Sequence, residues 1–258
     1  MLSFTPYKTG RRSAAFDLPQ LVDELVGKDV RDGDVIVISS KFMAISEGRI
    51  AELSSVVPGP RALELSKRFG VEAPLCELIV KESDEVIGGV QGFILTLWNG
   101  LLTPNAGIDR SNIEHGRAVL YPKDPAGSAV RVVQGVKGRR GVRAGVVVSD
   151  SRLMPTRIGT VGVALAAVGF QAILDMRGRP DLFGNPLKVT RQAIADDLCT
   201  AAQPVMGEAD EATPVVLVRG LTTEGYEDAV YAPRDFSIPV EQCVFMASLG
   251  YGPKPGAG

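Results

Sequence analysis

The feature that most limits the fold is a continuous apolar run at residues 35–38, which directly follows a turn at residues 31–34. Such a run, rich in β-branched residues and bounded by a turn signal, is typical of a strand buried in the core. Before the turn, apolar residues recur at helical spacing from Leu18 to Val26. Helix and strand therefore alternate at the start of the chain.

The middle of the chain has a different pattern. Residues 93–97, the turn signal Asn99-Gly100 and residues 101–102 predict a hairpin of antiparallel strands. Further along, residues 146–148 predict a second buried strand, and residues 194–205 have the apolar spacing of a helix. The fold class expected from these patterns is α+β.

Composition excludes several classes of partner. The 258 residues carry 28 Lys and Arg against 30 Asp and Glu, a net charge of −2, so no global field attracts nucleic acid or a lipid surface. The three cysteines are far apart and form no CxxC pair, and the N-terminal region lacks an apolar leader. We therefore expect a cytoplasmic protein without a membrane span. The apolar stretch at 158–174 is too short for a span and predicts a buried helix or strand.

Familiar catalytic and phosphate-binding motifs are missing from the sequence. It contains neither a GxxxxGK[ST] loop nor a GxGxxG between a strand and a helix. The basic, glycine-rich segment 135–141 predicts a solvated turn rather than a phosphate cradle. His115 is the single histidine and no GxSxG elbow accompanies it, so we expect it at the surface and name no catalytic nucleophile.

Acidic and hydroxyl residues stand where buried elements are expected to end. Asp150 and Ser151 follow the strand at 146–148, a place where ligands bind in open α/β layers. Asp109 lies in a loop rich in Gly, Asn and Ser, and Glu208 follows Gly207 at a helix end. These oxygen ligands suit Mg²⁺ or Mn²⁺ with nucleotide phosphates. The residues alone leave open a second interpretation, in which they are turn caps and surface acids.

Seven ordered blocks of the sequence resemble the coenzyme F420-0:L-glutamate ligase (gamma-glutamyl ligase) family. They are Gly33 to Lys41, Ser46 to Arg49, Pro104 to Asn112, Ser149 to Arg152, Asp181 to Gly184, Met206 to Glu208 and Arg219-Gly220. The resemblance implies a mixed, two-lobed α+β fold that is neither a P-loop nor a Rossmann fold. It implies one ligase unit over residues 1–250, followed by a disordered tail at 251–258.

The resemblance also implies a site. Asp109 and Asp150 would bind one metal ion, Ser151 and Glu208 a second, with Mg²⁺ or Mn²⁺ expected at both and K⁺ as a further candidate. The residues expected to contact or surround the nucleotide are Thr9, Gly10, Arg11, Arg12, Ser39, Ser40, Lys41, Asn112, Met206 and Gly207.

The reaction implied by the resemblance joins L-glutamate to the lactyl phosphate carboxylate of a deazaflavin precursor, F420-0, at the expense of GTP. Arg110, Arg152 or Arg157 would hold anionic substrate groups, and a homodimer is expected. The chain departs from the family at Ile45, where a lysine is usual. This departure keeps open an amide ligase or kinase for another small carboxylate, and a non-catalytic nucleotide-binding descendant.

Overall fold

The computed structural model describes residues 1–221 and 228–251, which form helices and mostly antiparallel strands. The helices are α1 Leu18–Val26, α2 Ser40–Ser46, α3 Pro60–Phe69, α4 Ala73–Glu82, α5 Pro125–Arg140, α6 Ile194–Met206 and α7 Val244–Ser248. The strands are β1 Ser3–Tyr7, β2 Val35–Ser39, β3 Ile50–Glu52, β4 Glu85–Val90, β5 Phe93–Trp98, β6 Leu101–Pro104, β7 Arg117–Val119, β8 Gly145–Leu153, β9 Thr160–Val168, β10 Leu174–Asp175, β11 Arg191–Gln192, β12 Val215–Arg219 and β13 Val230–Tyr231. The predicted α+β class is confirmed.

The largest element is a six-stranded sheet in the order β1-β12-β2-β8-β9-β13. Strands β2 and β8 are parallel, and the other neighbours in this sheet pair antiparallel. The apolar run at 35–38 lies in β2, between β12 and β8, and its side chains are at most 1% exposed. The buried strand predicted from the run is therefore confirmed.

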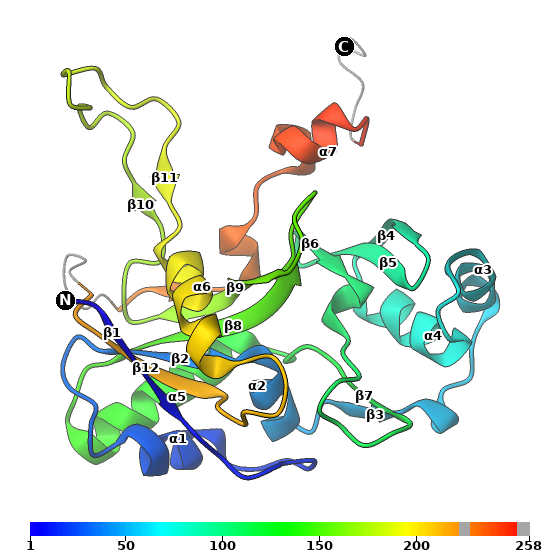
Figure 1. The fold of residues 1–258 in the computed structure, drawn as a ribbon, viewed down its shortest axis with the longest axis horizontal. Helices are drawn as coiled ribbons and strands as arrows, with labels where there is room; N and C mark the ends of the chain where they lie inside the picture. The colour runs from blue at the N-terminus through cyan, green and yellow to red at the C-terminus, as the bar shows by residue number, and fades with distance from the viewer. Residues whose placement is uncertain (222–227, 252–258) are drawn as a thin grey trace.

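Helices cover both faces of this sheet. Because side chains alternate along a strand, Ile36 and Ile38 pack with residues of α1 and α5, whereas Val35 and Val37 pack with residues of α6. Figure 1 shows α6 across one face of the sheet and α1 with α5 across the other. The sheet is thus the middle layer of three, and the ends of its strands are fixed by packing on both sides.

A second sheet, β4-β5-β6, packs with α3 and α4 around a separate apolar core. The predicted hairpin turn is confirmed, with positive φ at both Asn99 (48°) and Gly100 (78°). Helix α3 begins at Pro60 and is capped by Gly70 in the left-handed conformation, as its sequence indicates. The division of residues 1–250 into two lobes stays a prediction.

The solvated turn predicted at 135–141 is wrong, because residues 135–140 complete helix α5. Gly135 allows close packing: a Cβ added there would lie 3.2 Å from the Cβ of Pro19 on α1. The left-handed cap falls at Gly141, one residue after the helix ends. Tertiary contact therefore outweighs the low helix propensity of glycine.

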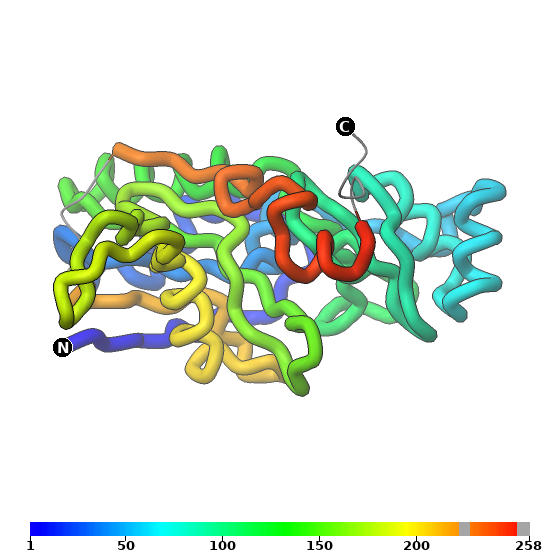
Figure 2. Tube along the Cα trace, turned by 90° about the horizontal axis from the view of Figure 1, so that it is seen from above, coloured from blue at the N-terminus to red at the C-terminus, as the bar shows by residue number. Residues whose placement is uncertain are grey.

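The apolar stretch at 158–174 contains β9, which confirms a buried element. Within the described residues, no helix combines the length and apolar character needed to cross a membrane. Strands β10 and β11 form a thin arm that projects from the body (Figure 1), and Figure 2 shows the same arm from above. The predicted tail at 251–258 lies outside the described residues, apart from Tyr251.

Candidate active site

A cavity of about 1000 Å³ collects the predicted site residues. Its lining includes Thr9, Gly10, Arg11, Arg12, Ser39, Ser40, Lys41, Asp109, Asn112, Asp150, Ser151, Met206, Gly207 and Glu208. These residues come from segments far apart in the sequence, so the fold is what brings them together.

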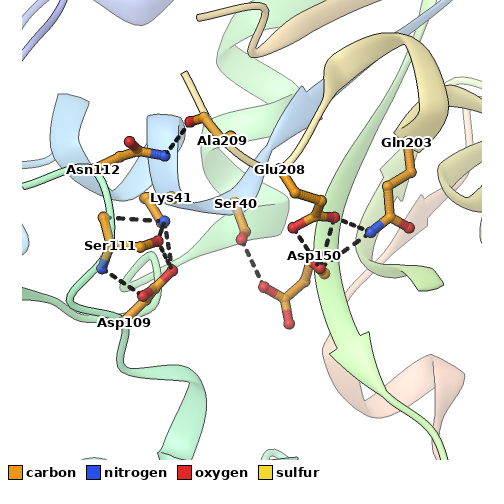
Figure 3. A network of polar contacts seen from close by, with 10 residues as sticks. Ser40, Lys41, Asp109, Ser111, Asn112, Asp150, Gln203, Glu208 and Ala209 are labelled. Carbon is orange, nitrogen blue, oxygen red and sulfur yellow. Dashed lines mark hydrogen bonds and ion pairs between the residues drawn. The ribbon is translucent and has the colours of Figure 1, made fainter. Parts of the chain in front are cut away.

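Asp150 lies beside the end of β2, although not at the end of its own strand. The prediction that β8 ends before Asp150 is wrong, because β8 runs to Leu153 in an antiparallel pair with β9. The pairing with β2 stops at Ser149, so Asp150 extends beyond the parallel pair. Its carboxylate accepts a hydrogen bond from the Ser40 hydroxyl at 3.0 Å, at the first residue of α2 (Figure 3).

Buried polar groups surround the other oxygen of Asp150. The Tyr121 hydroxyl donates a hydrogen bond to Oδ2, and a terminal guanidinium nitrogen of Arg152 lies 3.5 Å away. Burial raises the pKa of Asp150, although the charge of Arg152 and the hydroxyls of Tyr121 and Ser40 act in the opposite direction. Burial and the neighbouring Asp150 also raise the pKa of Tyr121 well above 10, so Tyr121 remains a proton donor.

Tyr121 is held in place by tight packing. Its ring lies edge-on to Trp98 with the centroids 4.6 Å apart. A Cβ added to Gly107 would lie only 2.0 Å from the Cζ of Tyr121, so the glycine lets the loop backbone approach the ring. The hydroxyl that reaches Asp150 is therefore positioned by two separate segments of the chain.

The loop that carries Asp109 has an irregular backbone, as its composition predicts. Asn105, Ala106, Gly107 and Asn112 all have positive φ. The Asn105 side chain accepts a hydrogen bond from the backbone nitrogen of Ile94 at 2.8 Å and ties the loop to β5. The loop thus has a defined shape that holds the aspartate in the cavity.

Asp109 is paired with a lysine on α2. Lys41 Nζ lies 2.5 Å from Oδ2, and the backbone nitrogen of Ser111 donates to Oδ1 at 2.7 Å. Burial alone would raise the pKa of Asp109, but the charge of Lys41 and the hydrogen bonds from Lys41 and Ser111 outweigh it and lower the pKa. The carboxylate is therefore ionised at neutral pH, and it remains 46% exposed to the cavity.

Ile45 lies one turn after Lys41 on α2 and is buried. It packs with Val119, and Phe16 and Ile113 contact the same cluster. Ile45 therefore makes an apolar contact at this place. Lys41, from the same helix, supplies a positive charge to the cavity.

A second group of oxygens lies at the end of α6. The Ser151 hydroxyl is 2.9 and 3.1 Å from the two carboxylate oxygens of Glu208, and Gln203 donates to both side chains. Gly207 ends the helix with φ 77°, which confirms the predicted turn. Figure 3 shows Gln203 and Glu208 of this group beside Asp150.

The segments predicted to contact the nucleotide are linked by hydrogen bonds. Asn112 Nδ2 donates to the backbone oxygen of Ala209 at 2.7 Å, and the backbone nitrogen of Thr9 donates to Ala212 at 2.8 Å. The guanidinium of Arg12 lies over the ring of Phe16 at 4.8 Å. These contacts bring three segments to one wall of the cavity, while the nucleotide role of each residue stays a prediction.

The donor chemistry fits a hard divalent cation that shares its coordination with phosphates. Asp109, Asp150, Ser151 and Glu208 provide oxygen donors. Among the described residues, no three His, Cys, Asp or Glu side chains come together as a metal site. This arrangement fits Mg²⁺ bound through one or two carboxylates and substrate phosphates, and it does not fit a closed cage of protein ligands.

The other predicted residues differ in their surroundings. His115 is exposed, as expected. Arg110 lines the cavity and pairs with Glu72 at 2.7 Å, and Arg157 is exposed. Sequence reasoning missed the contribution of Tyr121, which belongs to no motif and reaches Asp150 only through the fold.

Comparisons with known proteins identify the family of the chain. The model of the F420-0:gamma-glutamyl ligase family matches residues 13–220. The chain belongs to this ligase family. The coenzyme F420:L-glutamate ligase of Methanothermobacter thermautotrophicus is 38% identical over 82% of this chain and 86% of its own length. The protein of the same name from Methanocaldococcus jannaschii is 39% identical over 77% of this chain and 80% of its own length. The one from Halobacterium salinarum is 39% identical over 80% of this chain and 81% of its own length.

The family match covers Asp109, Asp150, Ser151 and Glu208, together with most of the other predicted site residues. The segment at residues 9–12 lies before the matched region. Its assignment to the site therefore depends on its position in the cavity, where it lies near residue 212.

Proposed function

We propose that this member of the F420-0:gamma-glutamyl ligase family joins L-glutamate to the carboxylate of F420-0, with GTP as the energy source. The observation that carries the proposal is that two acidic groups and the candidate nucleotide-binding segments line one cavity. One group consists of Asp109 and Asp150, and the other consists of Ser151 and Glu208. Relatives named coenzyme F420:L-glutamate ligase support the choice of substrates.

The chemistry proceeds in two steps. The acceptor carboxylate attacks the γ-phosphorus of GTP, and the bond between this phosphorus and the bridging oxygen breaks. The products of this step are an acyl phosphate and GDP. The amine of glutamate then attacks the acyl carbon, the bond to phosphate breaks, and the amine loses a proton as the amide forms. Neither step requires a protein nucleophile, which agrees with a sequence in which no catalytic nucleophile was identified.

The protein groups orient the reacting groups and neutralise the charge of the triphosphate. Two divalent cations, Mg²⁺ or Mn²⁺, would neutralise the triphosphate. Asp109 and Asp150 would hold the first cation, and Ser151 and Glu208 would hold the second. Lys41 brings a further positive charge to the same place, and Ser40 with Tyr121 fixes the orientation of the Asp150 carboxylate. Positioning of this kind is the main protein contribution to phosphoryl transfer.

Mass spectrometry of the reaction products tests the proposal. Purified protein is incubated with F420-0, L-glutamate, Mg²⁺ or Mn²⁺, and either GTP or ATP. We expect a product heavier than F420-0 by one or more glutamyl residues, formed with GTP and lost when a chelator is added. Phosphate release without a glutamyl product, or a product with another carboxylate only, would overturn the assignment.

We also propose a homodimer, because the β10–β11 arm exposes large apolar side chains. Leu182 is fully exposed and Phe183 is 90% exposed at its tip. An isolated two-stranded ribbon is at best marginally stable in water, so a second copy is the partner that fits an arm of this kind. Light scattering should give twice the mass of the chain, and Phe183→Ser should lower that mass.

A further inference from the structure

An exposed aromatic ring lies in the cavity away from the acidic groups. Phe93, the first residue of β5, lines the cavity and is 48% exposed. The preceding residue, Gly92, has φ 86°, and a Cβ added there would meet nothing within 4 Å. Open space therefore adjoins Gly92, and Gly92 lines the cavity next to Phe93.

Two further apolar residues line the cavity from neighbouring elements. Leu75 belongs to α4, and Pro104 ends β6 and pairs with Leu95 on the strand of Phe93. The hydrogen bond from Ile94 to the side chain of Asn105 holds this strand against the loop of Asp109. The backbone of the strand that carries Phe93 is therefore fixed relative to the loop of Asp109.

The hairpin of Phe93 and the end of α6 belong to different parts of the fold, and both line the cavity. In Figures 1 and 2 the β4–β5 hairpin is on one side of the loop that follows β6, and α6 with β12 is on the other. The predicted nucleotide residues Met206 and Gly207 end α6. In phosphoryl transfer the attacking and leaving oxygens are roughly in line. With the leaving oxygen of the nucleotide on the side of α6, an in-line acceptor approaches from the side of β5.

We propose that Phe93, with Leu75 and Pro104, forms a platform that stacks against the planar aromatic ring of the carboxylate acceptor. The inference rests on the proposed function, and it adds the part of the cavity that selects an aromatic acceptor. The acceptor's carboxylate would then point from this platform toward Asp109 and Asp150. Stacking of a heteroaromatic ring on an aromatic side chain contributes strongly to binding.

Steady-state kinetics of Phe93→Ala and Phe93→Tyr test the platform. We expect Phe93→Ala to raise the KM for F420-0 about tenfold, a change of about 1.4 kcal/mol, while the KM values for GTP and glutamate stay unchanged. Phe93→Tyr keeps the ring and should behave like the wild type. Val90→Ala is the matched control, because Val90 is 67% exposed and pairs with Phe93 on the same hairpin.

A direct binding measurement accompanies the kinetics. Phe93→Trp adds an exposed indole, and we expect its fluorescence to be quenched when F420-0 is added without nucleotide. The buried Trp98 serves as the background signal in the wild type. Quenching by GTP alone would show that the platform holds the nucleobase and would overturn the inference.

The results separate this inference from the proposed function. If the wild type makes the glutamyl product and Phe93→Ala has the wild-type KM for F420-0, the platform is wrong and the ligase assignment stands. An increase in the KM for GTP instead would also contradict the platform. If the wild type makes no glutamyl product, the proposed function fails and the inference fails with it.

Discussion

Gly107→Ala should both destabilise the protein and disturb the site, because two effects act at this residue. Gly107 has φ 72°, a conformation that costs about 1–2 kcal/mol for a residue with a Cβ. The added methyl would also lie 2.0–2.3 Å from three ring carbons of Tyr121. Overpacking of this kind typically costs a further amount of about 1–3 kcal/mol.

Gly33→Ala isolates the first effect, the conformational cost. Gly33 has φ 83°, but a Cβ added there meets nothing within 4 Å, so this variant has only the conformational cost. In thermal unfolding, about 1 kcal/mol corresponds to a shift of about 2–4 °C for a chain of this size. We therefore expect Gly107→Ala to melt several degrees below Gly33→Ala.

The activity of the two variants should differ as well. A displaced Tyr121 ring weakens the hydrogen bond to Asp150, so Gly107→Ala should lose kcat while Gly33→Ala keeps it. Equal melting temperatures and equal kcat values for the two variants would refute the clamped position of Tyr121.

Two further predictions concern stability. Asp34→Asn should cost about 2 kcal/mol in denaturant unfolding, because Asp34 is 2% exposed and its carboxylate accepts charge-assisted hydrogen bonds from Arg219; Asp32→Asn, at an exposed residue, should cost about 0.5 kcal/mol or less, and equal costs would contradict the role of the buried carboxylate. Burial and the hydrogen bond to Asp29 raise the pKa of Tyr7 to about 12, so the stability that protonated Tyr7 contributes is complete below about pH 10 and is lost as the pH rises toward 12. Melting temperatures across this range should fall less for Tyr7→Phe than for the wild type, and parallel curves would contradict the shift.

Local sequence patterns were enough to predict the elements that surround the site. The run at 35–38 indicated β2, the Asn99-Gly100 pair indicated the turn between β5 and β6, and Gly207 indicated the end of α6. In each case the signal comes from neighbouring residues, because turn geometry and burial depend on short-range chemistry.

Long-range contacts were not predictable in the same way. The polar residues 149–152 resemble the end of a strand, whereas pairing with β9 extends β8 through them. The glycines at 135–141 resemble a turn, whereas Gly135 and Gly138 lie inside α5 and Gly135 packs closely against Pro19. Tyr121 has no local signal at all, since its role comes from Trp98 and Gly107.

Binding of Mn²⁺ in the presence of a non-hydrolysable GTP analogue tests the central claim most directly. Calorimetric titration of the wild type should show Mn²⁺ binding that depends on the analogue. Asp109→Asn and Asp150→Asn should each weaken it at least about tenfold, or about 1.4 kcal/mol. Glu64→Gln, at an exposed residue of α3, should bind like the wild type. Unchanged Mn²⁺ affinity in both aspartate variants would contradict the proposal that this cavity holds the metal and the nucleotide.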